Sequence, residues 1–127
     1  MSRVSLRNGE LIDEILNRIA NGELLRAILR EDGKPHWTTF YNWLDDDEEL
    51  FLRFTRAREI GADAIAMEAL EIADTPLMGY RREQSKDGIK LIEDEMLGHR
   101  RLQVETRLKL LAKWFPQKYG DKQQVEH

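Results

Sequence analysis

The chain contains no cysteine, only three prolines and no long run of apolar residues. The lack of cysteine excludes disulfides and thiolate metal sites. No segment approaches the roughly 20 apolar residues needed to cross a bilayer, and no signal-peptide pattern opens the sequence. A glycine-rich phosphate loop is also missing. These absences predict a cytoplasmic protein that works without a membrane, a metal or another cofactor, and that is not an enzyme.

Charge is distributed unevenly along the 127 residues. Net charge is −4, but residues 1–44 hold six basic and six acidic side chains, residues 45–74 hold three and ten, and residues 75–127 hold eleven and eight. Contact with nucleic acid must therefore depend on where individual charges lie. The length suits one domain or two small helical units.

Periodicity predicts a mainly α fold with one small β-hairpin. A hairpin is expected at about 79–93, because Asp87-Gly88 separates two segments of strand character. Thr75-Pro76 and Pro116 are expected to end helices, and the acidic run 45–49 to start one. The predicted helices span about 10–20, 23–30, 36–44, 47–74 and 94–114, and the tail from Lys118 is expected to be loosely ordered.

The first three helices match a helix-turn-helix, with Gly33 in the turn before the third. The second helix is expected to bury Leu24, Ala27 and Ile28. Ala27 also offers the small residue needed where the two helices of the motif cross, and Phe40 and Trp43 offer apolar anchors. Many three-helix units pack this way without touching DNA, so an ordinary solvated face stays an alternative. The residues expected to contact DNA are Lys34, His36, Thr38, Thr39, Tyr41, Asn42 and, on an N-terminal arm, Arg3 and Arg7.

The fourth and last helices carry more apolar surface than one partner helix covers. Self-association is one explanation, and cover by the helix-turn-helix within one chain is the other. We predict a helix-turn-helix domain over 1–46, an oligomerisation domain over 47–115 and a tail over 116–127. The residues expected at subunit contacts are Phe54, Gly61, Ala64, Ile65, Ile72, Leu102, Leu110 and Trp114.

Other chemistry finds little support in the sequence. Helix-terminal acids account for 45–49 and 93–95, neither of which has the spacing of a calcium loop. The three histidines form no short metal-binding pair. The three tryptophans are expected to pack in the protein rather than to stack on bases.

A series of short motifs resembles the small terminase subunits of tailed bacteriophages that have an N-terminal helix-turn-helix. The likeness covers roughly residues 10–122, and the closing Pro-Xaa-Lys-Tyr-Gly-Asp-Lys segment is its most specific part. The motifs are Trp43-Leu44, Arg56-Ala57-Arg58, Ala62-Asp63, Glu71-Ile72-Ala73-Asp74, Arg101–Arg107 and Pro116–Lys122. Two departures are His36-Trp37, where the family more often has a small capping residue, and the few residues after Lys122, where family members often continue into a segment tied to the large subunit.

The resemblance implies a role in viral genome packaging in the cytoplasm of an infected bacterium. Small terminases of this type bind double-stranded viral DNA, form homo-oligomeric rings of eight or more subunits and engage the large terminase subunit, which carries the ATPase and nuclease. A dimeric helix-turn-helix transcription regulator is the alternative function. A pure assembly protein with no affinity for DNA is a third.

Overall fold

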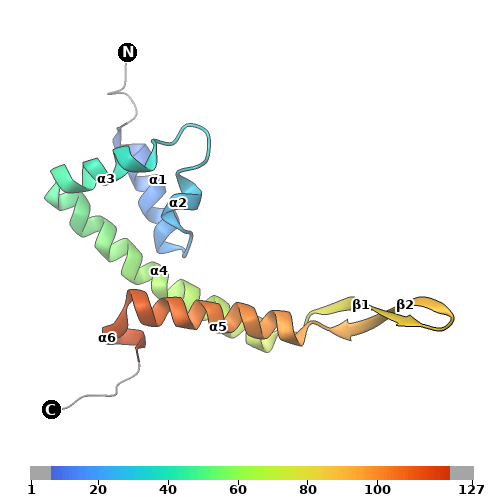
Figure 1. The fold of residues 1–127 in the computed structure, drawn as a ribbon. Coiled ribbons are helices and arrows are strands. Elements are labelled where there is room, and N and C mark those ends of the chain that lie inside the picture. Colours follow the sequence, from blue (N-terminus) through green and yellow to red (C-terminus); the bar gives the residue numbers. More distant parts are fainter. Residues whose placement is uncertain (1–6, 121–127) are drawn as a thin grey trace, which may run out of the picture. The chain divides into compact units, whose positions relative to one another are not determined.

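The computed structural model describes residues 7–120 and is mainly helical with one hairpin, as the sequence predicts (Figure 1). The chain divides into two compact units, residues 1–65 and 66–127, and the boundary between them falls within the fourth helix. The elements are α1 Gly9–Ala20, α2 Leu25–Ile28, α3 Trp37–Asp46, α4 Glu48–Asp74, β1 Met78–Ser85, β2 Gly88–Glu95, α5 Leu97–Trp114 and α6 Pro116–Tyr119.

Helix α1 is closed at both ends by its own sequence. The side chain of Asn8 accepts a hydrogen bond from the Leu11 N–H at 2.8 Å, which satisfies one of the unpaired amides of the first turn. At the other end Gly22 has φ +96°, and the Gly22 and Glu23 amides donate back to the carbonyls of Ile19 and Arg18. This is the turn that glycine allows after a helix, and it confirms the predicted stop.

The first unit folds around one apolar core that joins α1, α2, α3 and the first half of α4. The Phe40 ring lies at its centre, 5.9 Å from Trp43 and 6.0 Å from Phe54 between ring centroids. The prediction that Leu24 and Ala27 are buried is wrong. Helix α2 has only four residues, and both of these side chains are exposed. The core consists of Ile12, Ile15, Leu16, Ile19, Ile28, Leu29, Phe40, Leu44, Leu50, Phe54 and Ala57.

The end of α1 crosses α4 with backbone close to backbone. A Cβ placed on Gly61 would lie 2.2 Å from the carbonyl oxygen of Ile19, so only glycine fits at this point. A Cβ on Gly22 would lie 3.2 Å from the Cβ of Ala64. Small residues in α4 therefore permit a close crossing inside the N-terminal unit.

Asp47 separates α3 from α4. Its Oδ1 accepts a hydrogen bond from the Leu50 N–H at 3.1 Å, and Glu48 and Glu49 occupy the first turn of α4. Negative side chains at this end are stabilised by the helix dipole. The predicted role of the acidic run as a helix start is confirmed.

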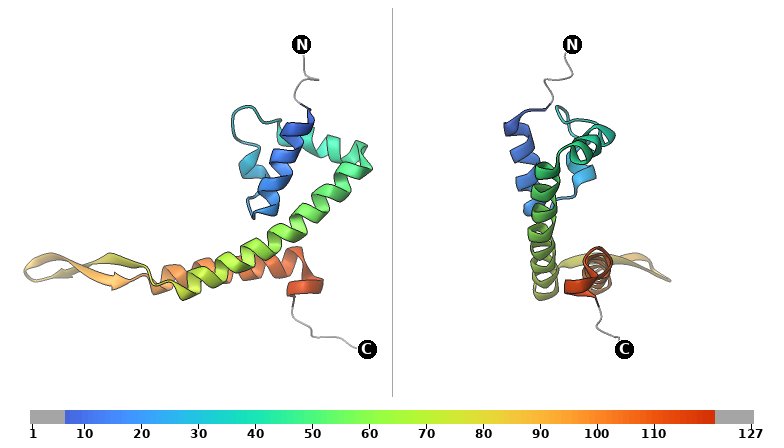
Figure 2. Two further views of the ribbon diagram at one scale, coloured as in Figure 1. Left: turned by 180° about the vertical axis from the view of Figure 1, so that it is seen from behind. Right: turned by 90° about the vertical axis from the view of Figure 1, so that its left-hand side faces the viewer.

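In the second unit the last turns of α4 lie beside the first half of α5 (Figures 1 and 2). Arg100 of α5 is buried and donates to the Ile72 carbonyl at 3.1 Å and the Ala73 carbonyl at 2.7 Å. It also forms an ion pair with Glu95 at the base of the hairpin. One arginine thus caps the end of α4 and ties α4, β2 and α5 together.

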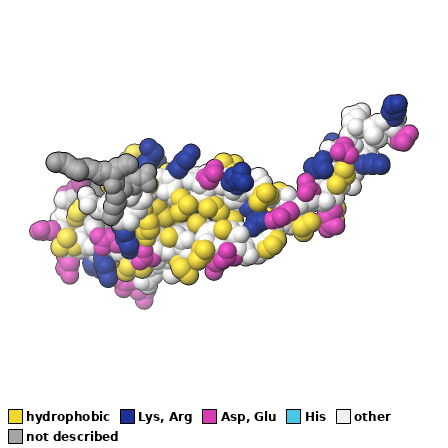
Figure 3. Space-filling view, turned by 90° about the horizontal axis from the view of Figure 1, so that it is seen from below, with side chains coloured by type: hydrophobic (Ala, Val, Ile, Leu, Met, Phe, Trp, Pro, Cys, Tyr) yellow, Lys and Arg dark blue, Asp and Glu magenta, His cyan; other side chains and the backbone are white. Residues whose placement is uncertain are grey.

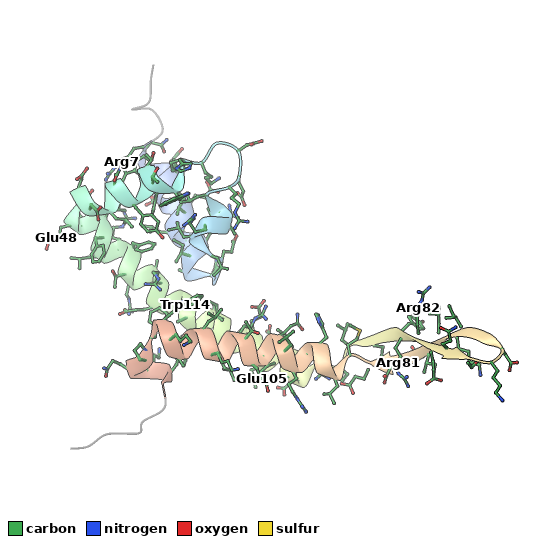
Figure 4. The ribbon with its side chains drawn as sticks, viewed as in Figure 1. Arg7, Glu48, Arg81, Arg82, Glu105 and Trp114 are labelled. Atoms are coloured by element: carbon green, nitrogen blue, oxygen red, sulfur yellow. The ribbon has the colours of Figure 1, made fainter. Side chains whose placement is uncertain are left out.

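The hairpin forms where it was predicted, with each strand slightly longer. β1 and β2 pair antiparallel from Met78–Glu95 to Ser85–Gly88, and Lys86 and Asp87 form the loop. Gly88 has φ +117°, which is why glycine follows the loop. Arg81 and Arg82 point to opposite faces of β1, as successive strand residues do (Figure 4).

Helix α5 ends at Trp114, before Pro116, as predicted. The expectation of a loosely ordered tail is wrong for Lys118 and Tyr119, which belong to the short helix α6. Their amides donate to the Phe115 carbonyl at 3.1 and 2.9 Å, and Pro116 occupies the helix start, where its missing N–H costs nothing. The rest of the expected tail, residues 121–127, lies outside the described residues.

Candidate nucleic-acid interface

Helix α3 has one face in the core and one face open to solvent. Phe40 and Leu44 are buried, whereas Thr38, Tyr41 and Asn42 are exposed and Thr39 is half-buried. Exposed hydroxyl and amide groups on the last helix of such a unit are what base edges and phosphates can bond. The structure therefore brings these four predicted residues together on one helix.

His36 caps α3. Its Nδ1 accepts from the Thr38 N–H at 3.2 Å and lies 2.7 Å from the Thr38 hydroxyl oxygen. The resemblance implies a small capping residue at this position, and here an imidazole performs the same local role. His36 holds the first turn of α3 in place and remains exposed.

Lys34, by contrast, points into a cluster of carboxylates. Its ammonium lies 3.2 Å from a Glu14 oxygen and 3.6 Å from a Glu31 oxygen, and only 10% of its side chain is exposed. Lys34 therefore stabilises the turn before α3, and its charge is paired within the protein instead of facing solvent.

Arg18 is the centre of the same ion-pair cluster. It bonds Glu23 and Glu31 at 2.6 Å each and reaches Glu14 at 3.5 Å. Hydrogen bonds from Arg18 lower the pKa of the Glu31 carboxyl to about 2 and also lower the pKa of Glu23. The two carboxylates in turn raise the pKa of Arg18 above its usual value. This cluster fastens the turn of the helix-turn-helix to α1.

Of the two arginines predicted on an N-terminal arm, Arg3 lies outside the described residues. Arg7 bonds an Asp47 oxygen at 2.5 Å, and its guanidinium carbon lies 5.5 Å from the centre of the Trp43 ring. The Asp47 carboxylate has a lowered pKa, first because the Leu50 amide donates to it and second because of Arg7. Arg7 is therefore fixed against α3 and the start of α4 (Figure 4 labels it).

Sequence reasoning missed Arg26, Arg30 and Trp37. Trp37 is 38% exposed and lies outside the core, where its ring packs against other surface side chains. The Arg26 guanidinium lies over its ring, 4.1 Å from the centroid. Among residues 7–65, Arg26 and Arg30 have no carboxylate within ion-pair distance. The sequence does not predict that Arg26 and Trp37 are in contact, because the turn between α2 and α3, which has no regular periodicity, brings them together.

Residues 7–120 contain no group of three or more histidine, aspartate or glutamate side chains placed to hold a metal ion. Within the same range, no helix has the length and apolar character of a membrane span.

The family described as Bacteriophage Sf6, terminase small subunit-like, matches residues 7–126. The chain belongs to this family of terminase small subunits. Three solved structures of the terminase small subunit of the bacterial virus Sf6, each with a different point mutation, are similar in fold. Each has a TM-score of 0.67 and 30% sequence identity, and the match covers 95% of this chain and 82% of the other. A comparison with curated protein sequences gave no match.

The residues predicted at subunit contacts of this terminase small subunit fall into two groups. Phe54, Gly61, Ala64 and Ile65 take part in packing within the first unit, against the core or against Ile19 and Gly22. In the second unit Ile72 is half-buried, whereas Leu102, Leu110 and Trp114 of α5 are exposed (Trp114 is labelled in Figure 4).

Proposed function

We propose that this chain binds double-stranded viral DNA, assembles into a ring and supports the start of genome packaging with the large terminase subunit in the infected host. It contributes binding and assembly, and the large subunit contributes the ATPase and nuclease. Membership of the terminase small subunit family over residues 7–126 is the observation that carries the proposal. The exposed faces of α3 and α5 supply the surfaces it needs.

The DNA-binding part of the proposal rests on α3. The major groove is about 12 Å wide and admits one helix. With Phe40 in the core, the opposite face of α3 presents Thr38, Tyr41 and Asn42. Asn42 is the residue suited to bidentate pairing with adenine, and the Thr38 methyl to contact with a thymine methyl. Thr39 and Tyr41 would bond the flanking backbone.

Among its described residues, the first unit has few unpaired positive charges, so strong binding to DNA requires several copies of the chain. Ion pairs occupy Arg7, Arg18, Lys34 and Arg53 of the first unit. Phosphate neutralisation supplies most non-specific affinity for DNA, so one copy would bind weakly. Copies joined in a ring bind far more strongly, because each later contact is made within an assembly already on the DNA.

The assembly part rests on apolar side chains that the second unit leaves in water. Leu102 of α5 is 62% exposed, and hydrophobic side chains reach the surface along the helices (Figure 3). Large apolar side chains exposed in this number indicate a protein interface. Those of α4 and α5 in the second unit are Met67, Leu70, Leu97, Leu102, Leu108, Leu110 and Trp114.

Fluorescence anisotropy of a labelled duplex with the full chain, over a salt series, tests both parts. Leu102→Glu is expected to block assembly and weaken binding by tenfold or more, because a charge cannot be buried unpaired at an interface. Asn42→Ala is expected to keep assembly and to lose sequence preference by about 1–3 kcal/mol. Absence of duplex binding by the unaltered chain at low salt would refute the proposal. Binding to the large subunit is tested separately by native mass spectrometry of the two proteins mixed. If the mass of this chain's assembly does not increase, the large subunit is not a partner.

A further inference from the structure

We propose that Arg26, whose guanidinium lies over the ring of Trp37, binds a backbone phosphate of the DNA. This inference rests on the proposed function and assigns a contact beside the recognition face of α3. Arg26 comes from α2 and Trp37 from the first turn of α3. The two residues meet across the turn that separates the helices.

The aromatic cluster around Arg26 lies at the surface. The Arg26 guanidinium carbon is 4.1 Å from the centre of the Trp37 ring. The Tyr41 ring packs edge to face with the Trp37 ring, at 6.0 Å between centroids and 76° between planes. Trp37 is 38% and Tyr41 39% exposed, although Phe40 on the same helix is fully buried. A large aromatic kept at the surface is typical of a contact surface, because its burial is deferred until a partner binds.

A guanidinium that lies over an aromatic ring can still donate hydrogen bonds to another group. A guanidinium on an aromatic ring contacts it with its flat face, while its five N–H groups point outward in the plane. Among residues 7–120 no carboxylate lies within ion-pair distance of Arg26. The planar fork fits two oxygens of a phosphate at once, and a ring that fixes the fork beforehand reduces the ordering required on binding.

The position of the cluster matches a phosphate at the edge of the groove. Trp37 and Tyr41 are one helical turn apart on α3, and Asn42 follows Tyr41. Side chains that flank a recognition helix contact the sugar-phosphate backbone and set the orientation of the helix. Arg26 therefore fills the role that the sequence alone gave to Lys34, whose charge Glu14 and Glu31 neutralise.

Binding of the full chain to two unrelated duplexes tests Arg26. Arg26→Gln is expected to weaken binding to both about tenfold or more and to reduce the salt slope by about one for each subunit in contact. Arg56→Gln is the matched control, because the Arg56 side chain is 73% exposed and its loss changes net charge equally. The control is expected to change affinity less than about twofold. Equal losses in both variants, or a loss confined to one duplex, would overturn a specific phosphate contact.

Trp37 acts here as a positioning residue, and a double-mutant cycle tests that role. Trp37→Leu is expected to weaken binding nearly as much as Arg26→Gln, and Trp37→Phe, which keeps an aromatic face, to restore most of the affinity. The double variant is expected to lose little more than either single one, since both remove the same contact. Fully additive losses would overturn the positioning role. If the unaltered chain binds and Arg26→Gln binds equally well, only this inference fails; if the unaltered chain binds no duplex, the proposed function fails with it.

Discussion

Replacing Gly61 by alanine tests the close crossing of α1 and α4. The new Cβ would lie 2.2 Å from the Ile19 carbonyl oxygen. Carbon and oxygen approach to about 3.3 Å at closest, so the two helices would have to separate by roughly 1 Å. Forcing extra atoms into a packed contact costs about 1–3 kcal/mol, and a rigid backbone neighbour places the cost at the upper end. Alanine regains about 1 kcal/mol as the better helix former. The net expectation is a loss of about 2 kcal/mol.

Thermal unfolding followed by circular dichroism measures this loss. For a unit of 60–100 residues, 1 kcal/mol corresponds to about 4–8 °C, so Tm should fall by roughly 10 °C. Gly98→Ala is the matched control, because it lies in α5 and a Cβ there meets nothing within 4 Å. The control should keep or slightly raise Tm. Both must be measured at one protein concentration, since association adds to apparent stability. An unchanged Tm in Gly61→Ala, with a change only in oligomeric mass, would refute the intrachain crossing.

Three further predictions concern single contacts. Arg100→Ala removes the cap on two carbonyls of α4 and strands Glu95, so unfolding free energy should fall by roughly 2–4 kcal/mol in thermal melts. Glu31→Gln should lower Tm at neutral pH, because it removes the carboxylate that pairs with Arg18. Since folding depresses the pKa of Glu31 to about 2, the extra stability of the unaltered chain over the variant is fully present above about pH 4.5 and is lost as pH falls toward 2. Gly88→Ala should loosen the hairpin by about 1–3 kcal/mol, since φ +117° strains any other residue, and amide hydrogen exchange across β1 and β2 should quicken.

Each of these has its own check. Arg100→Lys keeps the charge but not the fork, so it should lose less than the alanine variant; equal loss would show that the carbonyl bonds contribute nothing. For Glu31, a constant gap in Tm between native chain and variant from pH 7 to pH 2 would contradict the ion-pair account. Gly33→Ala also introduces a side chain at positive φ, but in the turn before α3, and should leave hairpin exchange unchanged.

Local patterns predicted most of the helices and the hairpin, because their causes are local. Asn21-Gly22 and Pro116 end helices by backbone geometry alone, and the acids after Asp46 start one by capping and charge. The short α2 could not be placed in detail, since tertiary contacts rather than periodicity decide which of its residues are buried. Leu24 and Ala27 are consequently exposed while Ile28 enters the core.

The candidate site was less predictable for the same reason. The sequence does not show that Lys34, just before α3, is paired, because Glu14 comes from α1 and meets Lys34 only in the folded chain. Likewise a small-residue pattern in α4 does not say whether a second copy or α1 fills it, and at Gly61 the occupant is Ile19. Arg26 on Trp37 is a contact across a turn, which no local pattern indicates.

The central claim is that many weak DNA-binding units, joined in one ring, together bind the viral DNA. Native mass spectrometry of the full chain with and without duplex DNA tests this claim. We predict one discrete multimer of eight or more subunits, whose mass increases by one duplex and whose duplex-bound fraction falls as salt rises. A spectrum of monomers and dimers only, with no duplex retained at the lowest salt, would contradict the claim.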